Sequence, residues 1–506
     1  MNFFKSTYYK KIIPKHIWLF LILTIGVIIR LYNIDLPLLD AKPHREIHTA
    51  EETRNLFFHP ETFFYPTSKL WADEPGYYIV EFPIYNALVA TFYFLTGNVN
   101  ESWGKIVSVL ASVGVVLFFY KLVDYHYGKS VAIWASTFMY LVSPQEIVLS
   151  RSFQPDQLGF LMGLVSLYYF SLWINNNKKL EFAISWVTLS LTLLIKISFF
   201  PFMFPMFYLL LKKWGVKAVR QHSLWIFVLS IIPVLVWYNH VRLVYLAYPQ
   251  LHSGKLVDPS DWLVFQKLLN IHWYANIFYD FIEQIITIPV GILTLISLFI
   301  KTKHNTFFVY WWILGVIVYG LLFIGKINFW YYQVPFIFPL AILAGIAITA
   351  IMKCLKPSLR FTKHTAVILM MGIIIPTAKP YLLRTYAISP RHAYVLETAA
   401  KVKSLTIPNS KIIASSHNSA ALTYYSLRPD LWGGTFLLQD ATCDTTCMIK
   451  RLEEMRNWGA TIFAISDKSE FGFNPEFEKY VRVHYPILAE TDHYIIFGLT
   501  LPLSSA

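Results

Sequence analysis

The chain has 506 residues, of which 56% are hydrophobic, 17% aromatic and only 14% charged. Soluble domains carry about 25% charged residues, so this composition excludes a soluble globular protein and predicts a mainly α-helical, polytopic membrane protein. The net charge of +13 does not indicate a nucleic-acid partner, because the basic residues form short clusters between apolar runs. Such clusters are typical of membrane topology.

Eleven apolar segments are predicted to cross the membrane, because about 17–25 apolar residues span a hydrocarbon core roughly 30 Å thick. The first segment lacks a small-residue cleavage site, so we expect a retained helix rather than a signal peptide. The predicted spans lie near residues 15–33, 103–123, 130–149, 156–174, 181–196, 198–211, 222–241, 276–300, 306–325, 331–352 and 365–382.

A further apolar segment, residues 82–97, decides the topology. The basic clusters all fall on one side of the membrane only if this segment does not cross it, and basic residues in short loops mark the cytoplasmic side. We therefore predict that it is an outer re-entrant or juxtamembrane helix, and that the N-terminus is cytoplasmic. This topology predicts that the following segments lie on the outer side of the membrane: residues 34–81, 150–156, the neighbourhood of Lys196, 242–275 and 325–332.

Residues 1–385 form the predicted transmembrane domain, and the composition changes after them. Residues 386–506 lack long apolar runs and alternate helical patterns with short apolar strands, which predicts a small α/β domain. The topology assigns this domain to the outer side of the membrane. Cys443 and Cys447 both lie in this predicted domain, and the sequence leaves open whether they form a disulfide.

The outer loop 34–81 holds a high density of ionisable groups. Charged groups beside a bilayer are costly unless solvated or paired, and they mark functional sites. Asp40 is either a general base, which needs reach to an acceptor proton, or a solvated loop residue. Glu81 precedes Pro83, where it either complements the N-terminus of a helix or enters the site to bind a cation or the acceptor.

Three ionisable residues near later spans are candidates for the same site. Asp156 follows Pro155 at the start of a span and is either a helix cap or a site residue. Arg151 either holds a phosphate or anchors the chain at the interface. Lys196 interrupts a long apolar region, where a phosphate ligand is favoured over a snorkelling lysine.

A polar and aromatic segment with Lys326, Tyr331 and Tyr332 follows the ninth predicted span. Interfacial anchoring accounts for its aromatic residues. His272 stands alone in the outer loop 242–275, and a lone histidine is usually not a ligand. The sequence contains no Walker loop, paired CxxC or HExxH motif.

An ordered series of short motifs runs through residues 15–350. It comprises Asp40 with His44-Arg45-Glu46, then residues 49–55, 81–85, 150–156 and 331–335. The series resembles the C-type glycosyltransferase superfamily, within the branch of dolichyl-phosphate-mannose protein mannosyltransferases and bacterial lipid A aminoarabinose transferases. Such enzymes move a sugar from a polyprenyl-phosphate carrier to an acceptor protein, lipid or glycan. They act outside the cytoplasmic membrane or in the ER lumen and use no nucleotide sugar.

The resemblance implies roles for the candidate residues. Asp40 would deprotonate the acceptor hydroxyl and Asp156 would help shape the same cavity. Stabilisation of the departing phosphate charge would be the largest catalytic term, and it falls to Arg151, Lys196 or Lys326. A divalent metal ion is a possible cofactor, held by Glu81 with His272. The predicted substrate-binding set is completed by His44, Arg45, Arg54, Tyr331 and Tyr332.

The chain also departs from the family pattern. Many relatives have an Asp-Glu pair where this chain has Arg45-Glu46, and close bacterial relatives often have Asp where it has His48. Either Asp40 is the base, or Glu46 serves, or the activity is altered. Three rival hypotheses stay open: a transporter or flippase, a polysaccharide polymerase or ligase, and a catalytically silent scaffold.

Overall fold

The computed structural model describes most of the chain: residues 15–40, 44–70, 75–220, 222–249, 251, 262–300, 306–327, 329–354, 383, 385–414, 419–431, 438 and 443–500. The span predicted at 365–382 lies outside the described residues. So do several of the basic residues that set the predicted topology, namely Lys5, Lys10, Lys11, Lys301, Lys303, Arg360 and Lys363.

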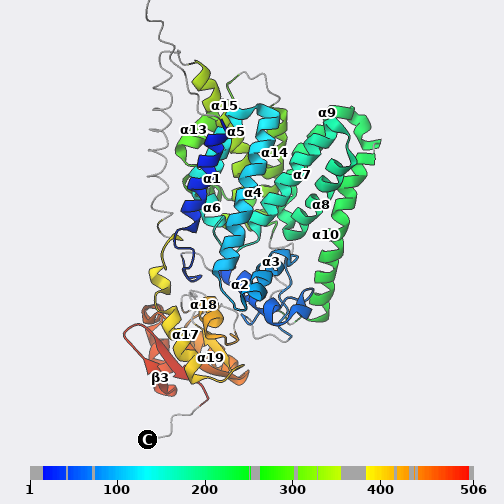
Figure 1. The fold of residues 1–506 in the computed structure, drawn as a ribbon. Coiled ribbons are helices and arrows are strands. Elements are labelled where there is room, and N and C mark those ends of the chain that lie inside the picture. The colour runs from blue at the N-terminus through cyan, green and yellow to red at the C-terminus, as the bar shows by residue number, and fades with distance from the viewer. Residues whose placement is uncertain are drawn as a thin grey trace, which may run out of the picture.

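Apolar helices run side by side in a bundle that forms the upper part of Figure 1. Helices that are apolar on most faces suit burial between neighbouring helices or contact with lipid. The bundle contains α1 (Lys15–Leu31), α4 (Ser102–Tyr127), α5 (Lys129–Thr137), η2 (Phe138–Val142), α6 (Pro144–Leu149), α7 (Asp156–Asn176), α8 (Lys179–Ile195), α9 (Met203–Trp214), α10 (His222–Ala247), α13 (Ile288–Ser297), α14 (Phe307–Leu322) and α15 (Ile337–Cys354). Short elements between these helices are η3 (Ile197–Phe202), η4 (Gly215–Arg220), α11 (Phe265–Leu268), α12 (Ile271–Asp280), η7 (Phe281–Ile286), η8 (Trp330–Tyr332) and η9 (Val334–Phe336).

Four described helices are long and apolar enough to cross a membrane: Ser102–Tyr127, Asp156–Asn176, Val228–Ala247 and Val334–Cys354. The segment predicted as one span at 276–300 is instead bent by 94° between two helices, and it adds a fifth span if both halves count together. The bend lies at Thr287, whose φ is 58°, two residues before Pro289, which cannot donate a helical hydrogen bond. The total of eleven spans stays a prediction.

Glycine allows α15 to approach α5 closely. A Cβ atom on Gly345 would lie 2.9 Å from the carbonyl oxygen of Val131 and 3.1 Å from the backbone nitrogen of Ala135. Large rings fill the neighbouring core, where Trp312 and Phe338 stack with centroids 5.9 Å apart. Close packing of this kind is typical of small residues at helix interfaces in membranes.

The polar loop after α1 lies at the lower end of the bundle in Figure 1, on the same side as the C-terminal sheet. It contains α2 (His44–Phe58) and η1 (Pro60–Thr62), and α3 (Ile84–Thr96) follows beside α2. The 13 residues of α3 extend about 20 Å at 1.5 Å per residue. This length is too short for a core of roughly 30 Å and suits the predicted juxtamembrane helix.

The C-terminal segment forms a four-stranded sheet in the order β1-β2-β4-β3, with β1 parallel to β2 and the other pairs antiparallel. Apolar clusters cover both faces of the sheet. A disulfide joins Cys443, which precedes α19, to Cys447 in the first turn of that helix. The elements are η11 (Pro390–His392), α17 (Val395–Leu405), β1 (Lys411–Ala414), α18 (Ser419–Ser426), α19 (Thr445–Asn457), β2 (Ala460–Ile465), η12 (Lys468–Phe473), α20 (Pro475–His484), β3 (Ile487–Glu490) and β4 (Ile495–Gly498).

Candidate functional site

Lys196 lies in a buried polar site where α8 ends. Its backbone is extended, with φ of −160° and ψ of 112°, because the helix stops before η3 begins. The Nζ atom donates a hydrogen bond of 2.8 Å to Oδ1 of Asp156, the first residue of α7. The two side chains are 7% and 0% exposed. A buried charge needs a partner of opposite sign, so each residue fixes the other.

Aromatic rings complete the surroundings of the ammonium group. The Nζ atom of Lys196 lies 4.5 Å from the ring centroid of Tyr331 and 4.9 Å from that of Tyr332. Both distances suit cation–π attraction. The Oδ2 atom of Asp156 is buried and has no hydrogen-bond partner within the described part of the chain. Such an atom costs free energy unless a ligand or water donates to it.

A second ion pair lies close by, between Arg45 near the start of α2 and Glu81 just before α3. The charges of Arg45 and Asp156 both act on the Tyr331 hydroxyl, so the two ion pairs share one neighbourhood. Glu52 lies on α2 within the field of Arg45. Burial raises the pKa of Glu52 to about 8 although the charge of Arg45 lowers it. We call these residues, with Lys196, Asp156, Tyr331 and Tyr332, the Lys196 site.

An apolar groove with a cavity of about 710 Å³ runs beside this site. Phe82, Leu194, Val236 and Trp237 contribute to its wall. The backbone nitrogen of Phe82 donates a hydrogen bond of 3.2 Å to the carbonyl oxygen of Leu194. Because Phe82 follows Glu81 and Leu194 precedes Lys196 by two residues, the groove adjoins the chain segments that carry both ion pairs.

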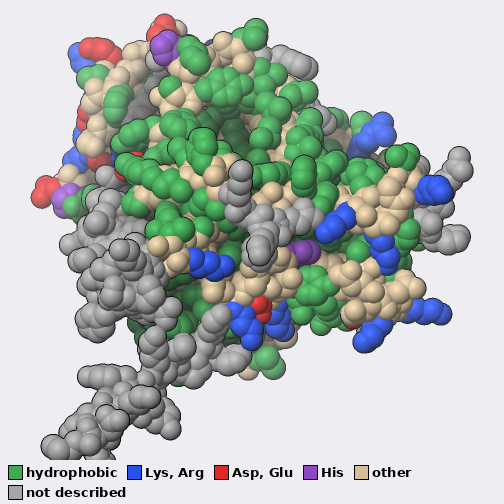
Figure 2. Space-filling model, turned by 90° about the horizontal axis from the view of Figure 1, so that it is seen from above, with side chains coloured by type: hydrophobic (Ala, Val, Ile, Leu, Met, Phe, Trp, Pro, Cys, Tyr) green, Lys and Arg blue, Asp and Glu red, His purple; other side chains and the backbone are tan. Residues whose placement is uncertain are grey.

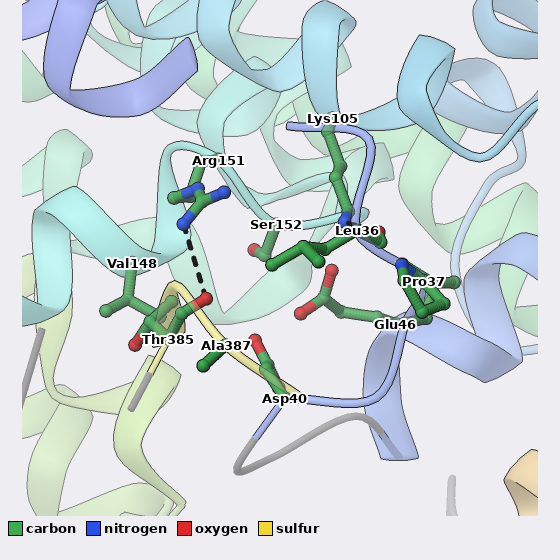
Figure 3. Close-up of a pocket in the computed structure, with 11 residues that line it drawn as sticks. Leu36, Pro37, Asp40, Glu46, Lys105, Val148, Arg151, Ser152, Thr385 and Ala387 are labelled. Atoms are coloured by element: carbon green, nitrogen blue, oxygen red, sulfur yellow. Dashed lines mark hydrogen bonds between the residues drawn. The ribbon is translucent and has the colours of Figure 1, made fainter. Parts of the chain in front are cut away.

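The predicted bases Asp40 and Glu46 lie in a different pocket, shown in Figure 3 with Lys105 and Arg151. Its cavity is about 20 Å³, which is room for a water molecule and not for a sugar. Burial and the charge of Asp40 raise the pKa of Glu46, whereas Lys105 and Arg151 oppose this change. We call these four residues the Asp40 pocket.

Three side chains of the Asp40 pocket form hydrogen bonds with the backbone. Lys105 Nζ donates to the Leu36 carbonyl at 2.5 Å, and Glu46 Oε2 accepts from the Phe153 nitrogen at 2.7 Å. Arg151 donates to the carbonyl of Tyr32 at 2.8 Å and to that of Thr385 at 3.3 Å, the bond dashed in Figure 3. These contacts join the ends of several helices.

The remaining candidates are not members of either group, although the charge of Arg45 acts on His44. The ring of His44 lies against that of His48, with centroids 4.5 Å apart. Arg54 pairs with Glu51 and donates to the Tyr424 carbonyl. Lys326 follows α14, and His272 is exposed on α12.

The metal prediction rests on Glu81 with His272, and the side chain of Glu81 is engaged by Arg45. No cluster of three or more potential ligand side chains occurs among the described residues. A site with two ligands stays a prediction.

Sequence reasoning did not assign two charged residues of these pockets. Glu52 lies within the motif 49–55, in which Arg54 was predicted as a site residue and Glu52 was not. Lys105 lies within α4, the longest apolar helix pattern before residue 130. A lysine in such a helix is itself a signal of a buried polar contact.

Comparisons with known proteins give a family model that matches part of the chain and solved structures with a similar fold. A family model of dolichyl-phosphate-mannose-protein mannosyltransferases matches residues 73–237, the segment with Glu81, Asp156 and Lys196. The fold is similar to the crystal structure of ArnT from Cupriavidus metallidurans bound to undecaprenyl phosphate, with a TM-score of 0.60 and 14% identity over 97% of this chain and 99% of ArnT. The chain resembles the polyprenyl-phosphate-dependent membrane glycosyltransferases. This confirms the resemblance inferred from the motifs.

Two further structures of this kind share the fold. The oligosaccharyltransferase of Archaeoglobus fulgidus, in a complex with Zn and sulfate, matches with a TM-score of 0.54 and 9% identity over 96% of this chain and 74% of that one. AglB of the same organism, in complex with an inhibitory peptide and a dolichol-phosphate, matches with a TM-score of 0.55 and 10% identity over 97% and 75%. A search of curated protein sequences gives no match.

Proposed function

We propose that this protein is a glycosyltransferase that moves a hexosyl or pentosyl group from a polyprenyl-phosphate carrier to an acceptor glycan, lipid or protein. The observation that carries the proposal is the Lys196 site, where the buried Lys196 and the part-buried Arg45 lie beside an apolar groove. The similar folds of ArnT bound to undecaprenyl phosphate and AglB in complex with a dolichol-phosphate support the class of carrier.

In this proposal the polyprenyl chain occupies the apolar groove and its phosphate reaches Lys196 and Arg45. Each cation is already paired with a carboxylate, Asp156 or Glu81. A phosphate carries more charge and more acceptor oxygens than either carboxylate, so it competes for both cations. Lys196 then turns from Asp156 to the phosphate, which leaves the carboxylate of Asp156 able to act as a base.

The reaction is a single displacement. The acceptor hydroxyl gives its proton to Oδ2 of Asp156 while its oxygen bonds to the anomeric carbon. The bond from that carbon to the phosphate oxygen breaks, and its electron pair leaves on polyprenyl phosphate. Lys196 and Arg45 stabilise the leaving charge in a site with little water. Displacement in one step inverts the anomeric configuration.

The test uses purified full-length protein with radiolabelled polyprenyl-phosphate hexoses and pentoses and a membrane extract as the source of acceptor. Wild type is compared with Asp156→Asn, Asp40→Asn and Glu46→Gln. We expect label transfer in wild type and its loss, by about 10²-fold or more, in Asp156→Asn. Loss in Asp40→Asn or Glu46→Gln alone would move the base to the Asp40 pocket. If no donor is consumed, the proposed activity is wrong; donor moved across vesicles without cleavage would favour a flippase.

We further propose that residues 1–385 form the transferase domain and that residues 386–506 form an outer domain. The protein lies in the plasma membrane in this proposal, and its N-terminus faces the cytoplasm. Figure 2, which views the opposite end of the bundle from above, has many Lys and Arg side chains on that face and few acidic ones. Described lysines at or beside the helix ends on this side of the bundle are Lys129, Lys178, Lys179, Lys212, Lys213, Lys217 and Lys353. Basic residues favour the cytoplasmic side, and a disulfide is typical of the outer side.

Cys354 gives a direct test of sidedness, because it is a free, exposed cysteine at the end of α15. A membrane-impermeant thiol reagent should label it in permeabilised cells and not in intact cells. A Cys354→Ser variant supplies the background signal. Labelling in intact cells would contradict the proposed orientation.

A further inference from the structure

A cleft lies between the end of α2, the loop after it and the C-terminal segment. Its cavity is about 960 Å³, larger than that of the apolar groove. Arg54 and Phe58 of α2 contribute to one wall, Lys69 belongs to the loop, and Lys411 and Tyr424 belong to the C-terminal segment. We call it the loop cleft. The Lys196 site does not contribute residues to it.

Hydrogen bonds hold the walls of the loop cleft in position. Arg54 donates to the Tyr424 carbonyl at 2.9 Å, and its guanidinium lies 4.2 Å from the Tyr424 ring centroid. The Asp430 nitrogen donates to the Lys69 carbonyl at 3.3 Å. The Tyr425 hydroxyl donates to Glu101 at 3.0 Å. A cleft with fixed walls loses less entropy on binding than one that must first be ordered.

The described lining of the loop cleft has more basic than acidic side chains. Lys69 and Lys411 line it, and neither is paired with a carboxylate in the part of the chain that the structure describes. Glu101 is the one carboxylate among its described lining residues. Burial raises the pKa of Glu101, which reduces its negative charge near neutral pH. A cleft lined by charge of one sign attracts ligands of the opposite sign.

Neutral lining groups suit a sugar. Phe58 is 61% exposed, so its flat apolar ring is available for stacking against a sugar, whereas the buried Tyr424 ring is covered by Arg54. Asn409 adds an exposed side-chain amide, which both donates and accepts hydrogen bonds. Asn55 adds an amide oxygen as an acceptor, because its nitrogen donates to the Thr67 carbonyl at 2.8 Å. Hydroxyl groups of a sugar need both functions. An acidic peptide would also pair with the lysines, and its binding is therefore compared directly in the test below.

Helix α2 links the loop cleft to the Lys196 site. Arg45 near its start belongs to the Lys196 site, and Arg54 near its end lines the cleft. Nine residues separate them, or about 14 Å at 1.5 Å per residue. A molecule that occupies the cleft while its hydroxyl reacts at Asp156 is therefore longer than a single sugar ring.

We propose that the loop cleft binds the acceptor, and that the acceptor is an anionic glycan of several sugar units that carries phosphate or carboxylate groups. This inference rests on the proposed transferase function and specifies the substrate class of the same site. The cleft holds the part of the glycan that is remote from the reacting hydroxyl, so its residues determine acceptor affinity and not the chemical step.

A binding experiment tests the cleft without need of activity. Full-length protein is titrated with sulfated dextran oligosaccharides, with neutral dextran of the same length and with an oligoglutamate peptide of similar charge. The double variant Lys69→Glu with Lys411→Glu should bind the sulfated oligosaccharide about tenfold or more weakly. The control variant Lys401→Glu with Lys479→Glu has the same net charge and changes two exposed lysines outside the cleft, so it should bind like wild type.

The outcomes separate this inference from the proposed function. Equal weakening in both double variants, or tighter binding of oligoglutamate than of the sulfated glycan, would overturn the anionic-glycan cleft. In the transfer assay, the cleft variant should raise the acceptor KM and leave the donor KM unchanged. An unchanged acceptor KM would also refute the cleft, whereas absence of donor consumption in every variant would refute the transferase function itself.

Discussion

Removal of the Lys196 ammonium should destabilise the protein strongly, because it leaves a buried charge alone. Lys196→Met keeps an unbranched apolar chain and deletes the charge that contacts Asp156 at 2.8 Å. The two side chains are 7% and 0% exposed, so water does not replace the lost partner. Breaking a buried ion pair from one side costs about 3–5 kcal/mol. Asp156→Asn should cost a similar amount, because it leaves the ammonium unpaired.

The double variant Lys196→Met with Asp156→Asn decides whether this reasoning holds. It removes both charges, so its loss of stability should be well below the sum of the two single losses. Thermal unfolding of the purified protein in detergent can be followed by the fluorescence of its 16 tryptophans. Transfer activity should be absent in both single variants and in the double variant. Additive losses of stability would show that the pair is not coupled and would refute the reasoning.

Two further outcomes follow from the structure. The pKa of Glu52 is raised from 4.5 to about 8, so the folded state binds a proton more tightly than the unfolded state, and stability should fall as pH rises between these values. Glu52→Gln should flatten the unfolding midpoint against pH in that window, and an unchanged slope would contradict this. Gly345→Ala should destabilise by about 1–3 kcal/mol, because its Cβ would lie 2.9 Å from the Val131 carbonyl; stability equal to wild type in thermal unfolding would show that α15 moves away from α5 freely.

Local sequence patterns predicted much of the fold, because apolar runs of sufficient length form helices with little dependence on distant residues. The helices at 102–127, 156–176 and 337–354 follow such runs. The strands at 411–414, 460–465 and 495–498 follow short apolar segments in a polar surrounding. The bend at Thr287 was missed, although Pro289 signals it, because average hydropathy does not register a single helix-breaking residue.

The pairing of charges could not be predicted in the same way. Lys196 was favoured as a phosphate ligand because a lysine in an apolar segment is costly unless it is paired or functional. Its partner Asp156 lies 40 residues away, so no local pattern in the sequence indicates the pair. Arg45 and Glu81 are 36 residues apart and meet through the packing of α2 and α3. Asp40 and Glu46 were proposed as bases from the motif series after the first helix, and this role stays a prediction. Glu46 faces the Asp40 pocket while Arg45 faces Glu81, because adjacent helical residues face different directions.

The Arg45–Glu81 pair bears on how this chain differs from its relatives. Where many relatives have an acidic residue, this chain has Arg45, and the structure joins its guanidinium to Glu81. A metal ion bound at Glu81 would have to displace that guanidinium, which already supplies a positive charge at the same carboxylate. If the carrier phosphate displaces Glu81 from Arg45, the positive charge that stabilises the leaving group comes from Arg45 and not from a metal ion. Arg45 therefore links the altered motif to the proposed chemistry, since it replaces an acidic residue with a cation for the departing phosphate.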